Sequence, residues 1–328
     1  MSLPLGLKDL NLRLSLKIKI KIMPSQRIQE INDIIAKLED FKKNPDSKDN
    51  IYAIEENIIF LNSVRSIPGY IKWLFNNAKG IDGNRLIELT DFSIEDWDKK
   101  MHGRLIIVQR NKNIGLGKPL VDKIVSFVLS EKKPLVLVSL GAGGMEIDRQ
   151  VLEILREQNY NQPLMIIGVD KSTHAHKIAI ENIRSTEKNL KIYEVEQLDK
   201  NKMEIIKKNE HGIAIILCKN DIFDLEEYFS NQYFDLLYHS LFGHHLSSAQ
   251  YEQMVDIIKK VSKKSYEYDG FKSWITLIPQ SITAWKYPLF LSDTIFSMLR
   301  YKTYDKAKLL GKKVTFFKKT GHYLREIE

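Results

Sequence analysis

From residue 134 onward the sequence repeats one pattern, a short apolar run followed by a segment with helical periodicity. The runs lack an alternation of apolar and polar residues, so the strands that they predict should be buried on both faces. Buried strands separated by helices are typical of a parallel sheet covered by helices on both sides. The runs are PLVLVSL (134–140), PLMIIGVD (163–170), GIAIILC (212–218), YFDLLYHS (233–240) and SWITLIP (273–279).

The end of the chain has a different pattern. In KKVTFFKKTGHYLREIE (312–328), two short β-type runs flank Thr320-Gly321, which predicts a tight hairpin and an antiparallel pair. Together, the runs predict an α/β fold with a doubly wound, mostly parallel sheet of seven strands, the last one antiparallel. LKIYEVEQL (190–198) is another strand candidate, but 212–218 is preferred as the third strand because it is more apolar.

The first part of the chain is predicted to be helical. IQEINDIIAKLEDF (28–41) and NIIFLNSVRSIPGYIKWLF (57–75) have apolar residues at helical spacing, and Pro68-Gly69 should interrupt the second segment. We therefore expect a helical substrate-cap region over 24–118, before a ligand-binding domain over 119–328. Residues 1–23 form an N-terminal extension, either an edge strand or a non-native segment, and apolar and polar residues alternate over its positions 10–22.

Composition limits the classes of partner and compartment. The net charge is +8, but the lysine pairs are spread along the chain without a compact basic stripe, so nucleic acid is not the favoured partner. The single cysteine, Cys218, lies in an apolar run; it excludes an internal disulfide and fits a cytoplasmic protein. No window approaches eighteen uncharged apolar residues, so no membrane span is expected.

The turn after the first apolar run carries the strongest ligand signal. VLVSLGAGGMEID (136–148) predicts a buried strand, a glycine turn and the N-terminus of a helix, which offers free N–H groups to a carboxylate or phosphate. The next strand ends in Asp170, where an acid in a doubly wound sheet bonds the ribose hydroxyls of a nucleoside. Read alone, the glycines form a common turn, and Asp170 or Ser172 caps a helix. Together they predict nucleoside binding.

Four segments resemble motifs of the class I S-adenosylmethionine-dependent methyltransferases, over about residues 119–328. They are LVSLGAGG, IIGVDKS, CKNDIFDL and FDLLYHSLFGHHL. LGAGGMEID also looks locally like the loop of histamine-type N-methyltransferases, without a further match that would carry over that substrate. Two positions depart from the superfamily pattern: Ser139 stands where an acid usually helps to hold the cofactor amino group, and Met145 replaces the third loop glycine.

The resemblance implies that S-adenosylmethionine is the cofactor and that each strand end holds one part of it. The loop glycines would approach the methionine part, Asp170 the ribose, and Asp221 the adenine amine, with Lys171 and Ile222 beside the adenine. His239 and Ser240 would lie below the sulfonium. The implied cofactor-binding residues are Ser139, Gly141, Ala142, Gly143, Asp170, Lys171, Asp221, Ile222, His239 and Ser240.

FDLLYHSLFGHHLSS (234–248) contains three histidines after an apolar run. A metal site is not expected, because no carboxylate or cysteine accompanies them at ligand spacing. Two interpretations stay open: the imidazoles shape the loop or cap the next helix, or one of them is the base that accepts a proton from the methyl acceptor. For the second, His245 is preferred because Leu246 should anchor the loop beside it, and His244 is the other candidate.

The sequence thus predicts a methyltransferase that acts on a nitrogen or oxygen nucleophile of a small molecule. One alternative is an RNA or protein methyltransferase that uses the lysine surplus. The other is a non-catalytic, nucleoside-binding descendant of the fold, for which the missing acid at Ser139 is an argument.

Overall fold

A computed structural model describes residues 25–43, 50–76, 100, 105–110, 115–229, 231–272, 285, 287–303, 313–317 and 321–327. The predicted extension 1–23 lies outside these residues. The chain divides into two compact units, Met1–Gly80 with Lys286–Pro288, and Ile81–Trp285 with Leu289–Glu328. No helix among the described residues is both long and apolar enough to cross a membrane.

The first unit is helical, as the sequence predicts for this part of the chain. Its helices are α1 (Ser25–Lys42), α2 (Ile51–Ser63) and α3 (Ile67–Asn76). Ile31, Ile34 and Leu38 lie at helical spacing on α1 and are buried. The Phe60 ring of α2 packs edge-on against Trp73 of α3, with 4.7 Å between ring centroids.

The predicted interruption of the second helical segment is confirmed, but it does not lie at Pro68-Gly69. The helices are separated at residues 64–66, and Pro68 lies in the first turn of α3. Proline is tolerated there for two reasons. The N–H groups of the first turn have no acceptor within the helix, and the φ angle that the proline ring fixes is already close to the helical value. The N–H of Gly69 is instead satisfied by Ser66 Oγ, at 3.1 Å.

The second unit contains the sheet. Its elements in chain order are α5 (Lys118–Ser130), β1 (Leu135–Leu140), α6 (Glu146–Glu157), β2 (Leu164–Val169), α7 (Thr173–Arg184), β3 (Lys191–Val195), α8 (Lys200–Asn209), β4 (Ile213–Cys218), η4 (Ile222–Asp224), α9 (Leu225–Tyr228), β5 (Leu236–Ser240), η5 (Gly243–His245), α10 (Ser248–Val261), β6 (Ser265–Lys272), α12 (Pro288–Arg300), β7 (Lys302–Thr303), β8 (Val314–Phe317) and β9 (His322–Ile327).

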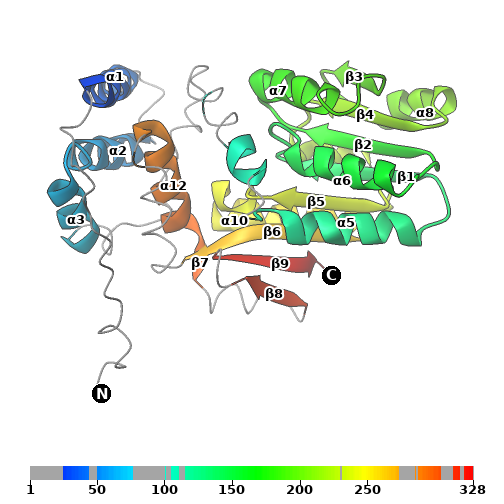
Figure 1. Cartoon of the computed structure of the whole chain (residues 1–328). Coiled ribbons are helices and arrows are strands. Elements are labelled where there is room, and N and C mark those ends of the chain that lie inside the picture. The colour runs from blue at the N-terminus through cyan, green and yellow to red at the C-terminus, as the bar shows by residue number, and fades with distance from the viewer. Residues whose placement is uncertain are drawn as a thin grey trace, which may run out of the picture. The chain divides into compact units, whose positions relative to one another are not determined.

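The strands lie in the order β3-β4-β2-β1-β5-β6-β9-β8, with the short β7 beside β6 (Figure 1). All pairs from β3 to β6 are parallel, whereas β9 is antiparallel to both β6 and β8. The predicted doubly wound, mostly parallel sheet with an antiparallel end is therefore confirmed, although the described residues hold more strands than the seven expected.

Two strands differ from the sequence prediction. Both 191–195 and 213–218 are strands, and the first lies at the edge, where its side chains are half-buried or exposed. The expected strand 273–279 lies outside the described residues. The strand β6 precedes it, in a segment that contains Glu267 and Asp269 and so does not resemble an apolar run.

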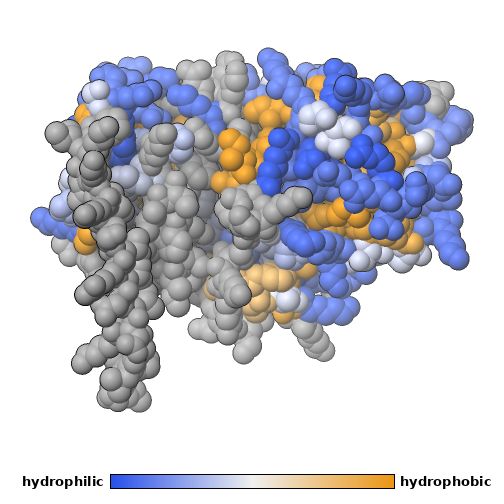
Figure 2. All heavy atoms as spheres, in the orientation of Figure 1, coloured by the Kyte–Doolittle hydropathy of each residue, from blue (hydrophilic) through white to orange (hydrophobic). Residues whose placement is uncertain are grey.

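Helices cover both faces of the sheet. Side chains of α5, α6 and α7 form one buried cluster with it, and side chains of α8, α9 and α10 form the other. In Figure 2 the surface over α6 is largely hydrophilic, with a hydrophobic strip along α5. Cys218 is buried in the second cluster, and burial raises the pKa of its thiol to about 12, as expected of a buried apolar residue rather than a nucleophile.

Candidate functional site

The strand order reverses at β1. From this strand the chain passes to β2 on one side, continues to β3 and β4, and then returns to β5 on the other side of β1. In doubly wound sheets, ligands bind outside the carboxyl ends of the strands at such a reversal. The loops after β1 and β5, residues 141–145 and 241–247, therefore flank the candidate site.

The glycine loop holds a backbone that few other residues adopt. Gly141 and Gly143 have φ of +56° and +51°, in the left-handed region that favours glycine. Met145 shares this region, with φ +52°, immediately before α6. A Cβ atom added to Gly141 would lie 2.4 Å from Cδ2 of Phe242, so the ring of the second loop lies directly against the first.

Gly141→Ala should lower the free energy of unfolding by about 2 kcal/mol, because alanine is strained at positive φ and its methyl group must displace the Phe242 ring. Gly115→Ala is the matched control: its φ is +63°, but no described atom lies within 4 Å of the added Cβ. Urea denaturation of both variants separates backbone strain from the clash. Equal losses would mean that the contact with Phe242 contributes nothing.

Asp170 ties the glycine loop to the next helix. Its Oδ2 accepts the N–H of Gly143 at 2.8 Å, and its Oδ1 accepts the N–H of Ser172 at 2.9 Å. Ser172 in turn caps α7 by accepting the N–H of Ala175. The capping interpretation is thus correct for Ser172. A carboxylate has about four acceptor positions, so Asp170 keeps capacity for ligand hydroxyls.

The residues predicted around the adenine also lie together. Lys171 Nζ lies 2.5 Å from Asp221 Oδ2, and Asp221 Oδ1 accepts the N–H of Phe223 at 3.1 Å. Ile222 is buried beside them in η4. The Lys171 side chain is 71% exposed, so this ion pair contributes little to stability. An adenine amine at Asp221 would compete with the lysine for one carboxylate oxygen.

At the end of β5, His239 is buried and its ring meets Phe242 edge-on, with 6.2 Å between centroids. The Oγ of Ser240 is buried without a hydrogen-bond partner among the described residues. A hydroxyl left in this condition costs about 1–3 kcal/mol, and such groups are rare unless a ligand or water serves them. Ser240 thus fits the edge of a ligand site.

His244 and His245 follow in η5. His244 is buried, with its Nδ1 2.8 Å from Asp269 Oδ1 and its backbone N–H donated to Asp269 Oδ2 at 3.1 Å. The two imidazole rings lie 4.3 Å apart. The carbonyl of His245 accepts a hydrogen bond from Arg300. In the tautomer whose Nδ1 donates to the Asp269 carboxylate, the lone pair of the imidazole lies on Nε2.

Sequence reasoning missed Asp269, which lies on β6 and is 1% exposed. The available signal was the acid pair in SYEYDGFK: Glu267 and Asp269 lie two residues apart and so on one face of a strand. Glu267 is fully buried and paired with Arg325, with 3.0 Å between Nε and Oε2. It also accepts hydrogen bonds from the hydroxyls of Tyr251, at 2.6 Å, and Tyr323, at 2.8 Å.

A second missed carboxylate lies beneath the glycine loop. Asp148 of α6 accepts a hydrogen bond from Tyr238 at 2.5 Å and one from Ser139 Oγ at 3.3 Å. Burial raises the pKa of this carboxyl to about 6, against the hydrogen bonds that lower it. The position that the superfamily fills with an acid is therefore a serine here, but an acid from the helix bonds that serine.

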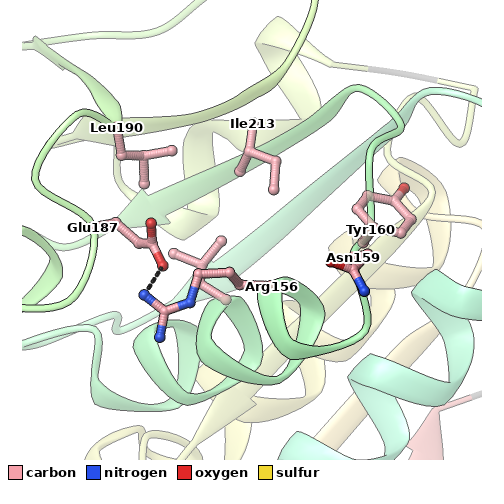
Figure 3. Close-up of a pocket in the computed structure, with 7 residues that line it drawn as sticks. Arg156, Asn159, Tyr160, Glu187, Leu190 and Ile213 are labelled. Atoms are coloured by element: carbon pink, nitrogen blue, oxygen red, sulfur yellow. Dashed lines mark ion pairs between the residues drawn. The ribbon is translucent and has the colours of Figure 1, made fainter.

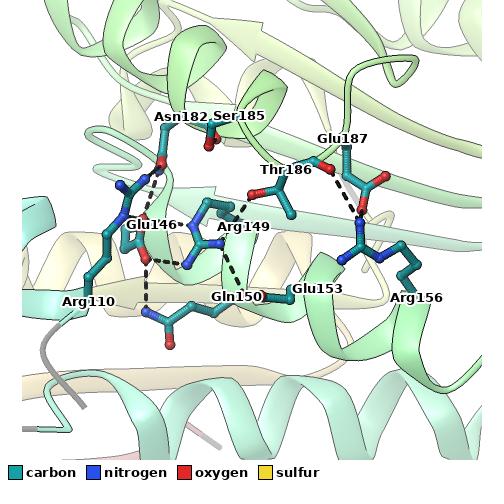
Figure 4. Close-up of polar contacts among 10 residues, drawn as sticks. All are labelled: Arg110, Glu146, Arg149, Gln150, Glu153, Arg156, Asn182, Ser185, Thr186 and Glu187. Carbon is teal, nitrogen blue, oxygen red and sulfur yellow. Dashed lines mark hydrogen bonds and ion pairs between the residues drawn. The ribbon is translucent and has the colours of Figure 1, made fainter. Parts of the chain in front are cut away.

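Glu146, two residues earlier, joins the loop to α7 (Figure 4). Its carboxylate accepts from Arg149 at 2.8 Å, Arg110 at 3.1 Å and Asn182 at 3.1 Å, and Asn182 also donates to the carbonyl of Gly144 at 2.7 Å. Burial would raise the pKa of Glu146, but these donors outweigh it and the pKa is lowered. Glu146 is thus an ionised structural brace.

A pocket of about 300 Å³ lies elsewhere (Figure 3). Its residues come from α6 and the turn after it, from the segment between α7 and β3, and from the amino end of β4. This edge of the sheet is opposite to the carboxyl ends where the glycine loop lies, and the Arg156–Glu187 ion pair at 3.1 Å closes one side. Its position gives it no part in the candidate site. Within the described residues, no group of three or more His, Cys, Asp or Glu side chains is arranged to hold a metal ion.

The sequence-predicted residues therefore gather at two neighbouring places. The glycine loop, Asp170, Lys171 and Asp221 lie at the ends of β1, β2 and β4, while His239, Ser240 and the histidine pair follow β5. The contact between Gly141 and Phe242 joins the two groups.

Comparison with known proteins finds a likeness of fold. No protein-family model and no curated protein matches the sequence. Among solved structures, a candidate S-adenosyl-L-methionine-dependent methyltransferase from Methanococcus maripaludis is 14% identical, with 71% of this chain and 94% of that one covered and a TM-score of 0.40. A candidate O-methyltransferase from Nostoc punctiforme is 15% identical, with 86% and 76% covered and a TM-score of 0.45. The magnesium protoporphyrin IX methyltransferase from Synechocystis with bound S-adenosylhomocysteine is 10% identical, with 79% and 94% covered and a TM-score of 0.38.

Proposed function

We propose that the protein is an S-adenosylmethionine-dependent methyltransferase that acts on a nitrogen or oxygen nucleophile of a small molecule. The observation that carries the proposal is the meeting of two features at one strand reversal. A glycine loop braced by Asp170 lies on one side, and a His244–Asp269 pair lies on the other. The first suits a nucleoside with a charged tail, and the second suits proton removal.

The residues present fit the cofactor. The left-handed glycines allow close approach to backbone, Asp170 keeps acceptor capacity for ribose hydroxyls, and Asp221 can accept an adenine amine. Ser240, at the end of β5, offers a buried hydroxyl that no group in the described part of the chain bonds. S-adenosylmethionine, when bound, supplies a methyl group on a sulfonium, which a nucleophile attacks in line.

The chain's own contribution is position and proton removal. We place the base at His244 rather than His245, because Asp269 fixes the orientation of the His244 ring. Nε2 of His244 would take the proton from the acceptor nitrogen or oxygen, and the Asp269 carboxylate would balance the charge of the imidazolium. Burial of both side chains excludes water and strengthens this pairing.

The surroundings of His244 favour a small acceptor. Its ring meets Tyr301 edge-on at 4.8 Å and His245 at 4.3 Å, so aromatic groups border the base. Part of the lysine charge is offset within the protein: Lys133 and Lys263 both pair with Asp235, at 3.1 and 2.8 Å. These pairs reduce the positive surface that an RNA substrate would need.

Thermal unfolding and methyl transfer test the proposal. S-adenosylmethionine or S-adenosylhomocysteine at one hundred times its dissociation constant should stabilise the protein by about 2.7 kcal/mol, whereas NAD should not. Methyl-labelled cofactor incubated with a panel of small amines, phenols and carboxylates should label one of these classes. Stabilisation by NAD alone would reject the proposal, and labelling of added RNA alone would favour the RNA alternative.

Asp170→Ala should weaken the binding of S-adenosylhomocysteine by about 10- to 100-fold, because it removes charged hydrogen bonds to the ribose and releases Gly143. Asp199→Ala is the matched control, since Asp199 also accepts a backbone N–H near a helix start, that of Lys202, but caps α8 away from the site. Isothermal titration calorimetry should show the loss only for Asp170→Ala. An equal effect of both changes would point to a general loss of stability.

A further inference from the structure

Asp148 differs in its partners from five other buried acids. Glu146 and Glu267 pair with arginines, Glu210 and Asp235 with lysines, and Asp269 with a histidine. Asp148 is 1% exposed, and its carboxylate is bonded by the neutral hydroxyls of Ser139 and Tyr238 and by its own backbone N–H. Among the described residues, no ion pair joins it to a lysine, arginine or histidine. A buried carboxylate without a cation is unfavourable, so its presence here calls for a physical reason.

The place of this carboxylate supplies one. Ser139 on β1 and Tyr238 on β5 are direct neighbours in the sheet, near the carboxyl ends of both strands. Asp148 bridges them from α6, so it lies at the strand reversal where the ligand is expected. The other acid at the start of α6 is Glu146, and its negative charge is already paired with Arg149 and Arg110.

We propose that Asp148 supplies the negative charge for the ammonium of the cofactor's methionyl group, acting through the hydroxyl of Ser139. The inference rests on the proposed function and names the residue that selects this end of the cofactor. Asp148 is a positioning residue, because the ligand does not touch its carboxylate. Ser139 donates to Asp148 and keeps lone pairs with which to accept from the ammonium.

The geometry also explains why a serine is sufficient at position 139. A carboxylate there would lie beside that of Asp148, and two like charges in a buried site repel each other. The serine hydroxyl is neutral: it donates a hydrogen bond to the Asp148 carboxylate and is polarised by it, so that its oxygen accepts more strongly from the ligand's ammonium. Asp148 and Ser139 together then take the place of the acid that the sequence lacks at the end of β1.

A pair of ligands separates this role from a purely structural one. S-adenosylhomocysteine carries the ammonium, whereas 5′-deoxy-5′-methylthioadenosine keeps the nucleoside and lacks the amino-acid tail. Asp148→Asn should weaken S-adenosylhomocysteine by about tenfold or more and change methylthioadenosine binding less than about twofold. Glu153→Gln, which removes one exposed charge from the same helix, is the control and should change neither affinity.

Calorimetry with the full-length protein gives each outcome a meaning. Equal weakening of both ligands by Asp148→Asn, or no weakening of either, overturns the role of Asp148 and leaves the proposed function standing. If wild-type protein binds neither ligand, the proposed function fails and this inference with it. Ser139→Ala should reproduce the selective loss, and an unselective effect would contradict the relay through its hydroxyl.

Discussion

Replacing His244 by alanine should lower turnover by about 10²- to 10⁴-fold and leave the affinity for S-adenosylhomocysteine unchanged. The size is that of a general base in other enzymes. The split follows from the structure, because His244 is held by Asp269 of β6, whereas the predicted cofactor contacts at Gly143, Asp170 and Asp221 lie at the ends of β1, β2 and β4. Turnover is measured with labelled cofactor and an acceptor from the panel, and affinity by calorimetry.

Two further variants make the result specific. His245→Ala should lower turnover far less, because it leaves the His244–Asp269 pair in place. Asp269→Asn keeps the shape of the side chain but cannot balance an imidazolium, so it should lower kcat with little change in ligand affinity. His244→Gln guards against a packing effect, because it fills more of the space beside Tyr301 than alanine. Full turnover in His244→Gln would reject the base.

The main sheet could be predicted because its strands have one physical signature. Strands β1, β2, β4 and β5 are buried on both faces, so their sequences are almost continuously apolar. The turn at Gly141 and Gly143 was readable for the same reason: few residues other than glycine adopt that backbone. These features depend on local sequence alone.

Strand β6 was not predicted, because the residues that pair with its buried acids lie far away in the sequence. Glu267 and Asp269 are buried on a sheet strand only because Arg325 and His244 lie opposite them. His244 is 25 residues from Asp269, and nothing in either local pattern announces the pair. The same reason explains why the choice between His244 and His245 could not be made from the loop sequence.

Asp148 was hidden by its position within a helix. At the end of β1, where an acid was expected, the sequence has Ser139. In the structure, the carboxylate beside this position belongs to Asp148, nine residues later in the chain. On a helical pattern an aspartate two residues after Glu146 reads as a favourable first-turn charge. Only the three-dimensional arrangement shows that it points inward to Tyr238.

Asp148→Asn should raise the stability of the ligand-free protein at pH 7.5 by about 3 kcal/mol. Burial raises the pKa of Asp148 from 3.8 to about 6, and each pKa unit corresponds to about 1.4 kcal/mol. Because the folded state holds this proton more tightly than the unfolded state, the stability due to Asp148 is fully present below pH 3.8 and is lost as the pH rises through 6. Above that value, the penalty for the buried charge is constant.

The measurement is a set of urea denaturation curves for wild type and Asp148→Asn between about pH 4.5 and 8. The difference in free energy of unfolding should be small at the acidic end, grow toward pH 6 and then level off; Glu153→Gln should show no such growth. A pH-independent difference would mean that Asp148 is not ionised in the folded protein and holds no charge for an ammonium. With saturating S-adenosylhomocysteine, the advantage of Asp148→Asn should shrink, because the ligand's positive charge then offsets the penalty that wild type bears alone.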